Sequence, residues 1–114
     1  LPGLRVPVVP QGVVHAAYKC YVYVVPERLR GGWNRNRILD QINLRGVPCY
    51  TGSCSEVYLE KAFDGTGWRP VERLQVAREL GETSLMFLVH PTLTESELAR
   101  TCEVMTEVMR MAIS

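Results

Sequence analysis

The chain has 114 residues, of which 46% are hydrophobic and 22% are charged. These values are typical of a globular chain with enough apolar residues for one core, so they exclude intrinsic disorder and favour one domain over two. Thirteen basic residues against 12 acidic residues leave a net charge of +1. No basic patch stands out, so nucleic acid is not an expected partner.

The sequence shows no targeting or membrane signal. Its longest apolar run, residues 85–89, is far shorter than the ~20 residues that cross a bilayer, and no basic and then apolar leader opens the chain. We therefore expect a cytoplasmic protein without a membrane partner. The first residue is Leu1 rather than Met, which suggests a piece of a longer protein.

The cysteines do not form a recognisable metal or disulfide pattern. Only Cys49 and Cys54 lie close together, and no second pair follows at the spacing that zinc sites use. Cys20 lies in a strand-like run and Cys102 on the apolar side of a helical pattern, where a free thiol behaves as a small hydrophobic group. We expect four reduced thiols and no metal.

The first half of the chain predicts an extended segment, a strand, a helix and a short strand. Three prolines make residues 1–14 an extended linker or strap. Residues 15–25 are rich in aromatic and β-branched residues and predict a strand that ends at Pro26. A helix is expected over residues 35–45, with Asn34 as its N-cap, Trp33 packed on Ile38 and Gly46 at its end. Residues 47–51 predict a short strand.

The second half predicts three helices and a central strand. After a turn at residues 52–55, a short helix is expected over residues 56–63, and a second helix begins near Pro70 and ends at Gly81. The side chains expected to face inward in this second helix are Val71, Leu74, Ala77 and Leu80. Residues 84–89 predict a buried central strand.

Thr94 and Glu97 form a capping box for the last helix. The residues expected on its buried face are Leu98, Cys102, Met105 and Met109. The order of elements is therefore β-α-β-α-α-β-α. It predicts an α/β (α+β) two-layer sandwich in which helices pack on a small sheet of about three strands.

The histidines and lysines show no clear catalytic pattern. His15 and His90 stand at the ends of strands with no acidic residue close in sequence, so we do not expect a catalytic relay. Lys19 and Lys61 are the only lysines. A Schiff-base lysine must be desolvated or placed beside another cation, and no cofactor partner is recognisable around either one. A catalytic amine at Lys19 is the minor alternative.

Two other features have both a binding and a structural interpretation. Residues 52–55, Gly-Ser-Cys-Ser, join a strand to a helix, where free N–H groups and hydroxyls either hold an anion or sugar hydroxyl or simply form a tight turn. Four tyrosines either stack against a sugar or base or pack within the sheet, and the second is the more common use. They are Tyr18, Tyr21, Tyr23 and Tyr50.

Three segments carry a resemblance to a known family: AYKCYVYVVPERLR, ILDQINLRGVPCYTGSCSEVYLEKAF and RELGETSLMFLVHPTLTESEL. They resemble the C-terminal domain of the DegT/DnrJ/StrS family, pyridoxal-phosphate-dependent aminotransferases that act on nucleotide-linked keto sugars. The resemblance implies the small-domain fold of the aspartate-aminotransferase type of enzyme. Residues 1–14 would be a linker from a large N-terminal domain, and residues 15–114 the small domain.

The same resemblance implies a homodimer whose large domain supplies the Schiff-base lysine, so that this piece binds no cofactor and is not catalytic alone. Many family members carry histidines in the stretch after the first helix, whereas this chain has none there. By position, Gly52 and Ser53 replace a His-Tyr pair and Tyr58 replaces a later histidine. We expect Tyr50, Ser53, Cys54 and Tyr58 to contact the substrate. The alternative is a freestanding α/β module for ligand sensing or dimerisation.

Overall fold

The computed structural model describes residues 1–113, and a small antiparallel sheet forms its centre. The strands lie in the order β1-β2-β4-β3. Their bounds are β1 Leu4–Arg5, β2 Lys19–Val24, β3 Cys49–Tyr50 and β4 Ser84–Leu88. The predicted α+β sandwich is confirmed, with four strands instead of about three. The additional strand is β1, which pairs with β2 from within the segment that we expected to be a linker.

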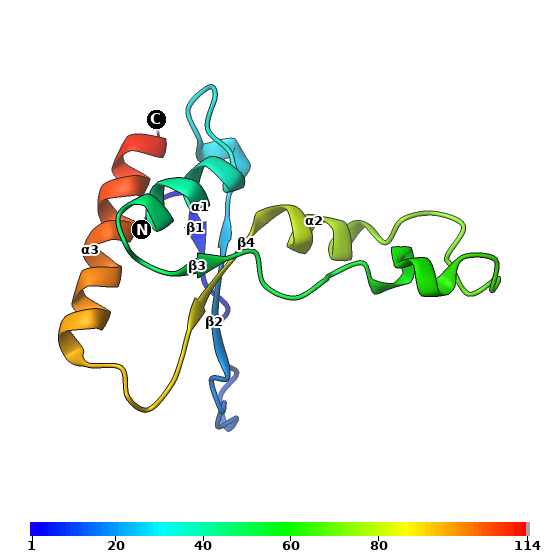
Figure 1. Cartoon of the computed structure of the whole chain (residues 1–114), viewed down its shortest axis with the longest axis horizontal. Coiled ribbons are helices and arrows are strands. Elements are labelled where there is room, and N and C mark those ends of the chain that lie inside the picture. Colours follow the sequence, from blue (N-terminus) through cyan, green and yellow to red (C-terminus); the bar gives the residue numbers. More distant parts are fainter. Residues whose placement is uncertain (114) are drawn as a thin grey trace.

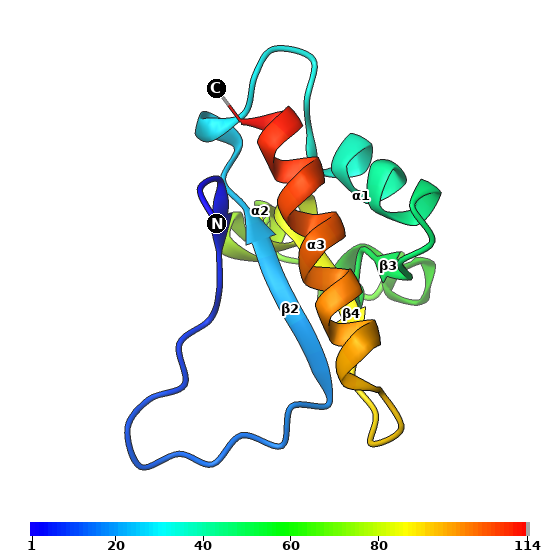
Figure 2. The ribbon, with the colours of Figure 1, turned by 90° about the vertical axis from the view of Figure 1, so that its left-hand side faces the viewer.

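Helices cover both sides of this sheet. In Figure 1, α1 and α3 lie on one side of the strands and α2 on the other, and in Figure 2 α3 passes in front of β4, with β2 beside it. The bounds are α1 Arg35–Leu44, α2 Gln75–Thr83 and α3 Glu95–Ala112, with 3₁₀ turns at η1 Pro26–Arg28, η2 Val57–Leu59 and η3 Lys61–Phe63.

The predicted starts of α1 and α3 are confirmed by their caps. The Asn34 side chain accepts the Arg37 N–H at 2.9 Å. Thr94 and Glu97 form the reciprocal capping box: the Glu97 N–H donates to Thr94 Oγ1 and the Thr94 N–H donates to Glu97 Oε2. These bonds satisfy N–H groups that the first turn of a helix leaves unpaired.

The core lies between the sheet and the pair α1 and α3. Directly paired strand residues share a face of the sheet, and Val22 pairs with Leu85 while Cys20 and Cys49 both pair with Phe87. We call this side the helix-covered face. The helical residues buried against it are Ile38, Ile42, Val104, Met105, Val108, Met109 and Ala112.

Two residues expected on the buried face of the last helix are exposed. Met105 and Met109 are buried as predicted, but Leu98 and Cys102 lie in the first turns of α3, where a groove remains open between the helix and the strands. The helical period predicts which residues share one face of a helix. It does not predict how far along the helix the sheet continues, so the predicted burial was wrong for the N-terminal half of α3.

The predictions for β2 and β3 were both too long. The strand expected from residue 15 begins at Lys19 because Ala17 has a φ of +46° and its N–H donates to His15 Nδ1 at 2.8 Å, which makes a local turn. The strand expected over residues 47–51 is reduced to Cys49–Tyr50. Its outer edge does not meet another strand, because the Asn43 side chain from α1 bonds both the N–H and the carbonyl of Cys49.

Residues 56–74, which we call the arm, depart most from prediction. Figure 1 shows the arm extending away from the sheet. The expected helix over residues 56–63 is instead η2 and η3, separated by Glu60 with extended backbone. The helix expected from Pro70 begins only at Gln75, so Val71 and Leu74 lie outside it and are exposed, and it continues past Gly81 to Thr83.

Candidate functional site

The second face of the sheet carries the tyrosines. Across three strands, Tyr21 of β2 pairs with Met86 of β4, and Met86 pairs in turn with Tyr50 of β3. Tyr23 follows on the same face, and its ring stacks beside that of Tyr21 with centroids 6.4 Å apart. We call this side the tyrosine face. Tyr18, the fourth tyrosine of the predicted set, precedes β2 and is exposed.

The helix α2 covers only one end of the tyrosine face. The guanidinium of Arg5 lies over the Tyr23 ring at 4.6 Å and reaches Glu79 of α2 at 4.0 Å. At the other end Tyr50 keeps 48% of its surface exposed. In the row Tyr50–Met86–Tyr21, Tyr50 is thus open to a ligand and Met86 is buried, whereas Tyr23 is covered by Arg5 and α2.

A short loop at residues 51–55, which we call the β3 loop, borders this row. Three contacts anchor the loop to different elements. The buried Ser84 hydroxyl donates to the Thr51 carbonyl at 2.6 Å. Ser53 bonds Tyr21 of β2. Ser55 lies so close to α2 that a Cβ on Gly81 would collide with its hydroxyl. Gly81 therefore permits close packing and does not end the helix, as we had expected.

The contact between Tyr21 and Ser53 is reciprocal. The Ser53 N–H donates to the Tyr21 hydroxyl at 3.1 Å, and the same hydroxyl donates to Ser53 Oγ at 3.3 Å. The Ser53 side chain, followed by the Ser53 N–H, lowers the pKa of Tyr21 below its usual value, because both groups can bond the ionised phenolate. Gly52 has a φ of +90° and lies directly over the ring, so any side chain there would overlap Tyr21.

A second cluster closes the base of the arm. Glu56, whose side chain is 13% exposed, is paired with the Arg73 guanidinium and accepts the Tyr58 hydroxyl at 2.6 Å. Tyr58 Oη accepts the Leu74 N–H at 2.9 Å. The pKa of Glu56 is lowered to about 2, first by the Arg73 hydrogen bond and then by the Tyr58 hydrogen bond. These bonds hold Leu74 out of the helix predicted around it.

The arm is held further by Arg69. Its guanidinium donates to the carbonyls of Tyr58, Leu59 and Glu60 and pairs with Asp64. These carbonyls end the η2 turn, and their capture by one planar group keeps the backbone from continuing as a helix. The arm therefore keeps its shape mostly through polar contacts, while its Trp68 and Val71 side chains remain exposed.

The four predicted site residues fall into three groups. Tyr50 and Ser53 lie along the row of the tyrosine face. Cys54 follows in the β3 loop, where its thiol donates to Glu60 Oε1 at 3.4 Å. Tyr58 belongs to the Glu56 cluster in the arm. Glu56 and Arg73 were not expected in the site, and Tyr21 was expected only as one of four tyrosines that either stack on a ligand or pack within the sheet. Strand alternation places Tyr21 on the face opposite Val22, but no spacing rule relates Glu56 to Arg73, 17 residues later.

Neither histidine forms a catalytic pair. His15 Nδ1 accepts the Ala17 N–H, and His90 Nδ1 bonds the Thr92 hydroxyl at 2.7 Å. The four cysteines are free thiols, and residues 1–113 contain no group of three His, Cys, Asp or Glu side chains suited to a metal. Within the same residues, no helix has the length and apolar character needed to cross a membrane.

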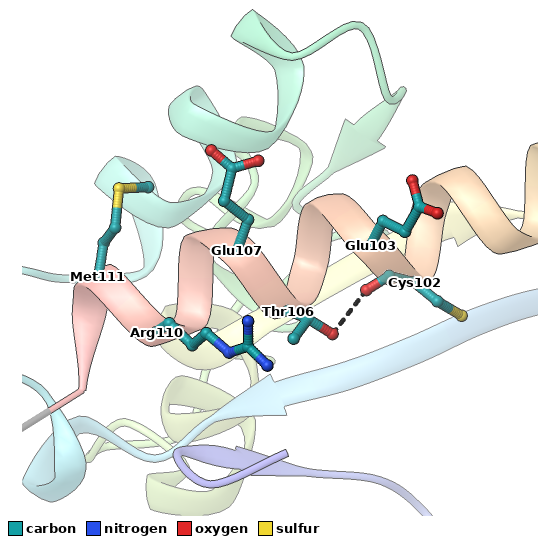
Figure 3. A pocket seen from close by; sticks show the side chains of 6 residues that line it. All are labelled: Cys102, Glu103, Thr106, Glu107, Arg110 and Met111. Atoms are coloured by element: carbon teal, nitrogen blue, oxygen red, sulfur yellow. Dashed lines mark hydrogen bonds between the residues drawn. The ribbon is translucent and has the colours of Figure 1, made fainter.

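An apolar groove lies on the other side of the sheet, away from the tyrosine face. It is open, has a volume of about 1260 Å³ and runs between the N-terminal segment, the strands β2 and β4, and the first turns of α3. Its wall includes Val6, Cys20, Phe87, Leu98 and Met105. A shallower pocket of about 580 Å³ follows the outer side of α3, where Figure 3 shows Glu103, Glu107 and Arg110. None of the predicted site residues lines either cavity.

Comparison with known proteins gives matches among solved structures. The aminotransferase from Psychrobacter cryohalolentis is 55% identical over 94% of this chain, with a TM-score of 0.89. The aminotransferase TlmJ from Streptoalloteichus hindustanus is 19% identical over 96% of the chain, with a TM-score of 0.78. A DegT DnrJ EryC1 StrS aminotransferase from Brucella abortus is 21% identical over 92%, with a TM-score of 0.73. The last two matches show a shared fold alone.

The match at 55% identity confirms the resemblance to an aminotransferase that the sequence predicts. The DegT DnrJ EryC1 StrS structure adds a shared fold. This chain spans only 26% to 28% of the length of those proteins. It therefore has the sequence and fold of one part of an aminotransferase. No family model and no curated protein matches it.

Proposed function

We propose that this chain is the C-terminal small domain of a pyridoxal-phosphate-dependent aminotransferase that aminates a nucleotide-linked keto sugar. The observation that carries the proposal is the 55% identity to an aminotransferase over 94% of the chain. The sugar substrate is supported by the resemblance to the DegT/DnrJ/StrS family in the three segments quoted above. In this proposal the chain acts only together with a large domain, and the enzyme is a homodimer.

The residues of this chain do not fit the cofactor itself. Pyridoxal phosphate needs a lysine amine held in a cavity, with an acidic partner for its ring nitrogen. Lys19 lies over the Tyr18 ring at 5.3 Å, Lys61 is exposed, and neither lines the groove or the α3 pocket. No ion pair joins either lysine to a carboxylate within residues 1–113. We therefore assign the cofactor site to the large domain.

In the proposed enzyme this chain supplies substrate contacts from Tyr50 of β3 and from the β3 loop. The half-exposed ring of Tyr50 offers an apolar surface for a sugar or base, and the hydroxyl of Ser53 offers a hydrogen-bond donor. Cys54, the residue after Ser53 in the β3 loop, is a further substrate contact in this proposal. Tyr58 contributes through the arm, because its two hydrogen bonds determine where the arm leaves the β3 loop.

The proposal also assigns a use to the apolar groove. Monomeric proteins rarely expose large contiguous apolar surfaces unless another part of the protein or a partner covers them. The groove borders the N-terminal segment that we expect to lead from the large domain. Contact with the rest of the enzyme is the role we assign to it.

A labelling experiment tests the division of labour. The isolated chain and the complete enzyme are incubated with pyridoxal phosphate and reduced with borohydride. The mass and position of any adduct are then determined by mass spectrometry. We expect one stoichiometric adduct on the complete enzyme at a lysine outside this chain. A stoichiometric adduct at Lys19 or Lys61 would overturn the assignment.

Turnover by the complete enzyme tests the substrate. With an amino donor such as glutamate, a nucleotide-linked keto sugar should be converted to the amino sugar, while the isolated chain is inactive. The matched comparison is a free keto acid offered as acceptor. Preference for the keto acid would contradict the sugar proposal and leave the aminotransferase assignment in place.

A further inference from the structure

We infer that Tyr21 is a positioning residue for the substrate, because its hydroxyl holds the β3 loop so that the Ser53 hydroxyl can donate to an oxygen of the sugar. This inference rests on the proposed function. It concerns a residue of β2 that does not itself have to touch the substrate. The evidence is the geometry of one phenol group that bonds both the backbone and the side chain of Ser53.

The direction of the hydrogen bonds determines what Ser53 can offer. The Tyr21 hydroxyl accepts the Ser53 N–H and donates its own proton to Ser53 Oγ. Ser53 Oγ is thus an acceptor within the protein, and neither of the Ser53 hydrogen bonds within residues 1–113 uses the proton of the Ser53 hydroxyl. That proton is free for an outside acceptor. Keto, hydroxyl and phosphate oxygens of a sugar nucleotide are acceptors of this kind.

The surroundings make this arrangement stiff. Gly52 rests on the Tyr21 ring, the Ser84 hydroxyl binds the Thr51 carbonyl, and Ser55 packs on Gly81. The loop is thus anchored on both sides of Ser53. In the described part of the chain, both hydrogen bonds of Ser53 itself are made with Tyr21. A donor held in place before the ligand arrives loses less entropy on binding than a mobile one.

Position on the sheet supports a role in binding. Tyr21 stands in the same row as Tyr50, with Met86 between them. Two strand spacings, about 10 Å, separate the positions of the two tyrosines. Tyr50 at one end and Ser53 at the other can therefore contact one ligand.

The experiment uses the complete enzyme with Tyr21→Phe, Ser53→Ala and the double variant. Phenylalanine keeps the ring under Gly52 and removes both hydrogen bonds. We expect Tyr21→Phe to raise the KM for the nucleotide-linked keto sugar by about 3- to 10-fold, the usual worth of one hydrogen bond, with kcat nearly unchanged. The double variant should be no worse than Ser53→Ala alone, because the two residues act as one unit.

Tyr23→Phe is the matched control. Tyr23 lies on the same strand and face but is covered by Arg5 and is not bonded to the β3 loop, so its KM should equal that of the wild type. Additive effects of Tyr21→Phe and Ser53→Ala, or an unchanged KM in Tyr21→Phe, would overturn the inference.

Hydrogen exchange gives a readout that does not depend on turnover. The Ser53 amide should exchange at least 5-fold faster in Tyr21→Phe than in wild type or Tyr23→Phe, since its acceptor is gone. Unchanged exchange would overturn the inference directly. Faster exchange in an enzyme that does not turn over any nucleotide-linked sugar would instead overturn the proposed function and, with it, the role of Tyr21 in that reaction.

Discussion

At the scale of single residues, the β3 loop depends on Gly52. Its φ of +90° is open to glycine but strained for other residues, and a Cβ there would lie 2.9 Å from the Tyr21 hydroxyl and closer still to its ring. Tyr21 cannot move aside easily, because its hydroxyl is bonded twice to Ser53. Gly52 and Tyr21 are therefore coupled through packing as well as hydrogen bonding.

We expect Gly52→Ala to lower the free energy of unfolding by about 3 kcal/mol, from backbone strain and overpacking together. Gly65→Ala is the matched control, because Gly65 also has a positive φ, +69°, but has no atom within 4 Å of a Cβ. It should cost about 1 kcal/mol, the strain alone. Urea unfolding of both variants measures the difference, and equal losses would contradict the packing of Gly52 on Tyr21.

Glu56 predicts a dependence of stability on pH. Its pKa in the folded chain is about 2, because Arg73 and then Tyr58 bond the ionised carboxylate. Since the ordinary value is 4.5, the ionised form stabilises the fold above pH 4.5, and this contribution is lost as the pH falls toward 2. The stability difference between wild type and Glu56→Gln should therefore be largest above pH 5 and shrink below it. Urea unfolding between pH 6 and pH 2.5 tests this, and a constant difference would argue against the ion pair.

At the scale of elements, α3 behaves as two halves. Its C-terminal half packs on the sheet with Val104, Val108 and Ala112 fully buried, while its N-terminal half borders the open groove. The apolar side of α3 is thus buried against the sheet in one half and exposed to the groove in the other. The apolar residues of the first half contribute little to the stability of this chain.

Substitution to aspartate along that stripe tests the difference. Met105→Asp places an unpaired charge in the core, so we expect it to lower the free energy of unfolding by at least about 3 kcal/mol. Leu98→Asp, on the same helix but exposed, should change it by less than about 1 kcal/mol. Thermal or urea unfolding of the two variants suffices. Similar losses would mean that the groove is closed in solution.

At the scale of the whole molecule, the chain leaves much apolar surface uncovered. The groove exposes Leu88, Val89 and Leu98 on one side of the sheet, and the arm exposes Trp68 and Val71 on the other. Surfaces of this kind bind hydrophobic dyes. They also fit a chain that matches little more than a quarter of the length of its structural relatives.

We expect the isolated, folded chain to enhance the fluorescence of anilinonaphthalene sulfonate. Leu98→Lys should weaken the enhancement because it places a charge in the groove. Lys61→Arg, a change at an exposed site outside the groove, serves as the control and should leave it unchanged. A wild-type chain that does not enhance the dye would show that the groove is covered.

The sequence alone determined the features that depend on neighbouring residues. Asn34, Thr94 and Glu97 predicted the starts of α1 and α3 because a cap bonds N–H groups two or three residues away. The apolar run at residues 84–89 predicted β4, and the quoted segments predicted the resemblance to aminotransferases. In each of these cases the contacts that matter lie within a few residues or within a recognisable segment.

Only the tertiary structure decided features that join distant parts of the chain. Three contacts show this. The hydrogen bond between Tyr58 and Leu74 spans 16 residues and the ion pair between Glu56 and Arg73 spans 17. The hydrogen bond between Tyr21 and Ser53 spans 32 residues. Local propensity favoured a helix through Leu74, but the Leu74 N–H instead donates to the hydroxyl of Tyr58 in the η2 turn. The physical reason is that a backbone N–H bonds whichever acceptor folding brings to it, and periodicity in the sequence carries no record of that acceptor.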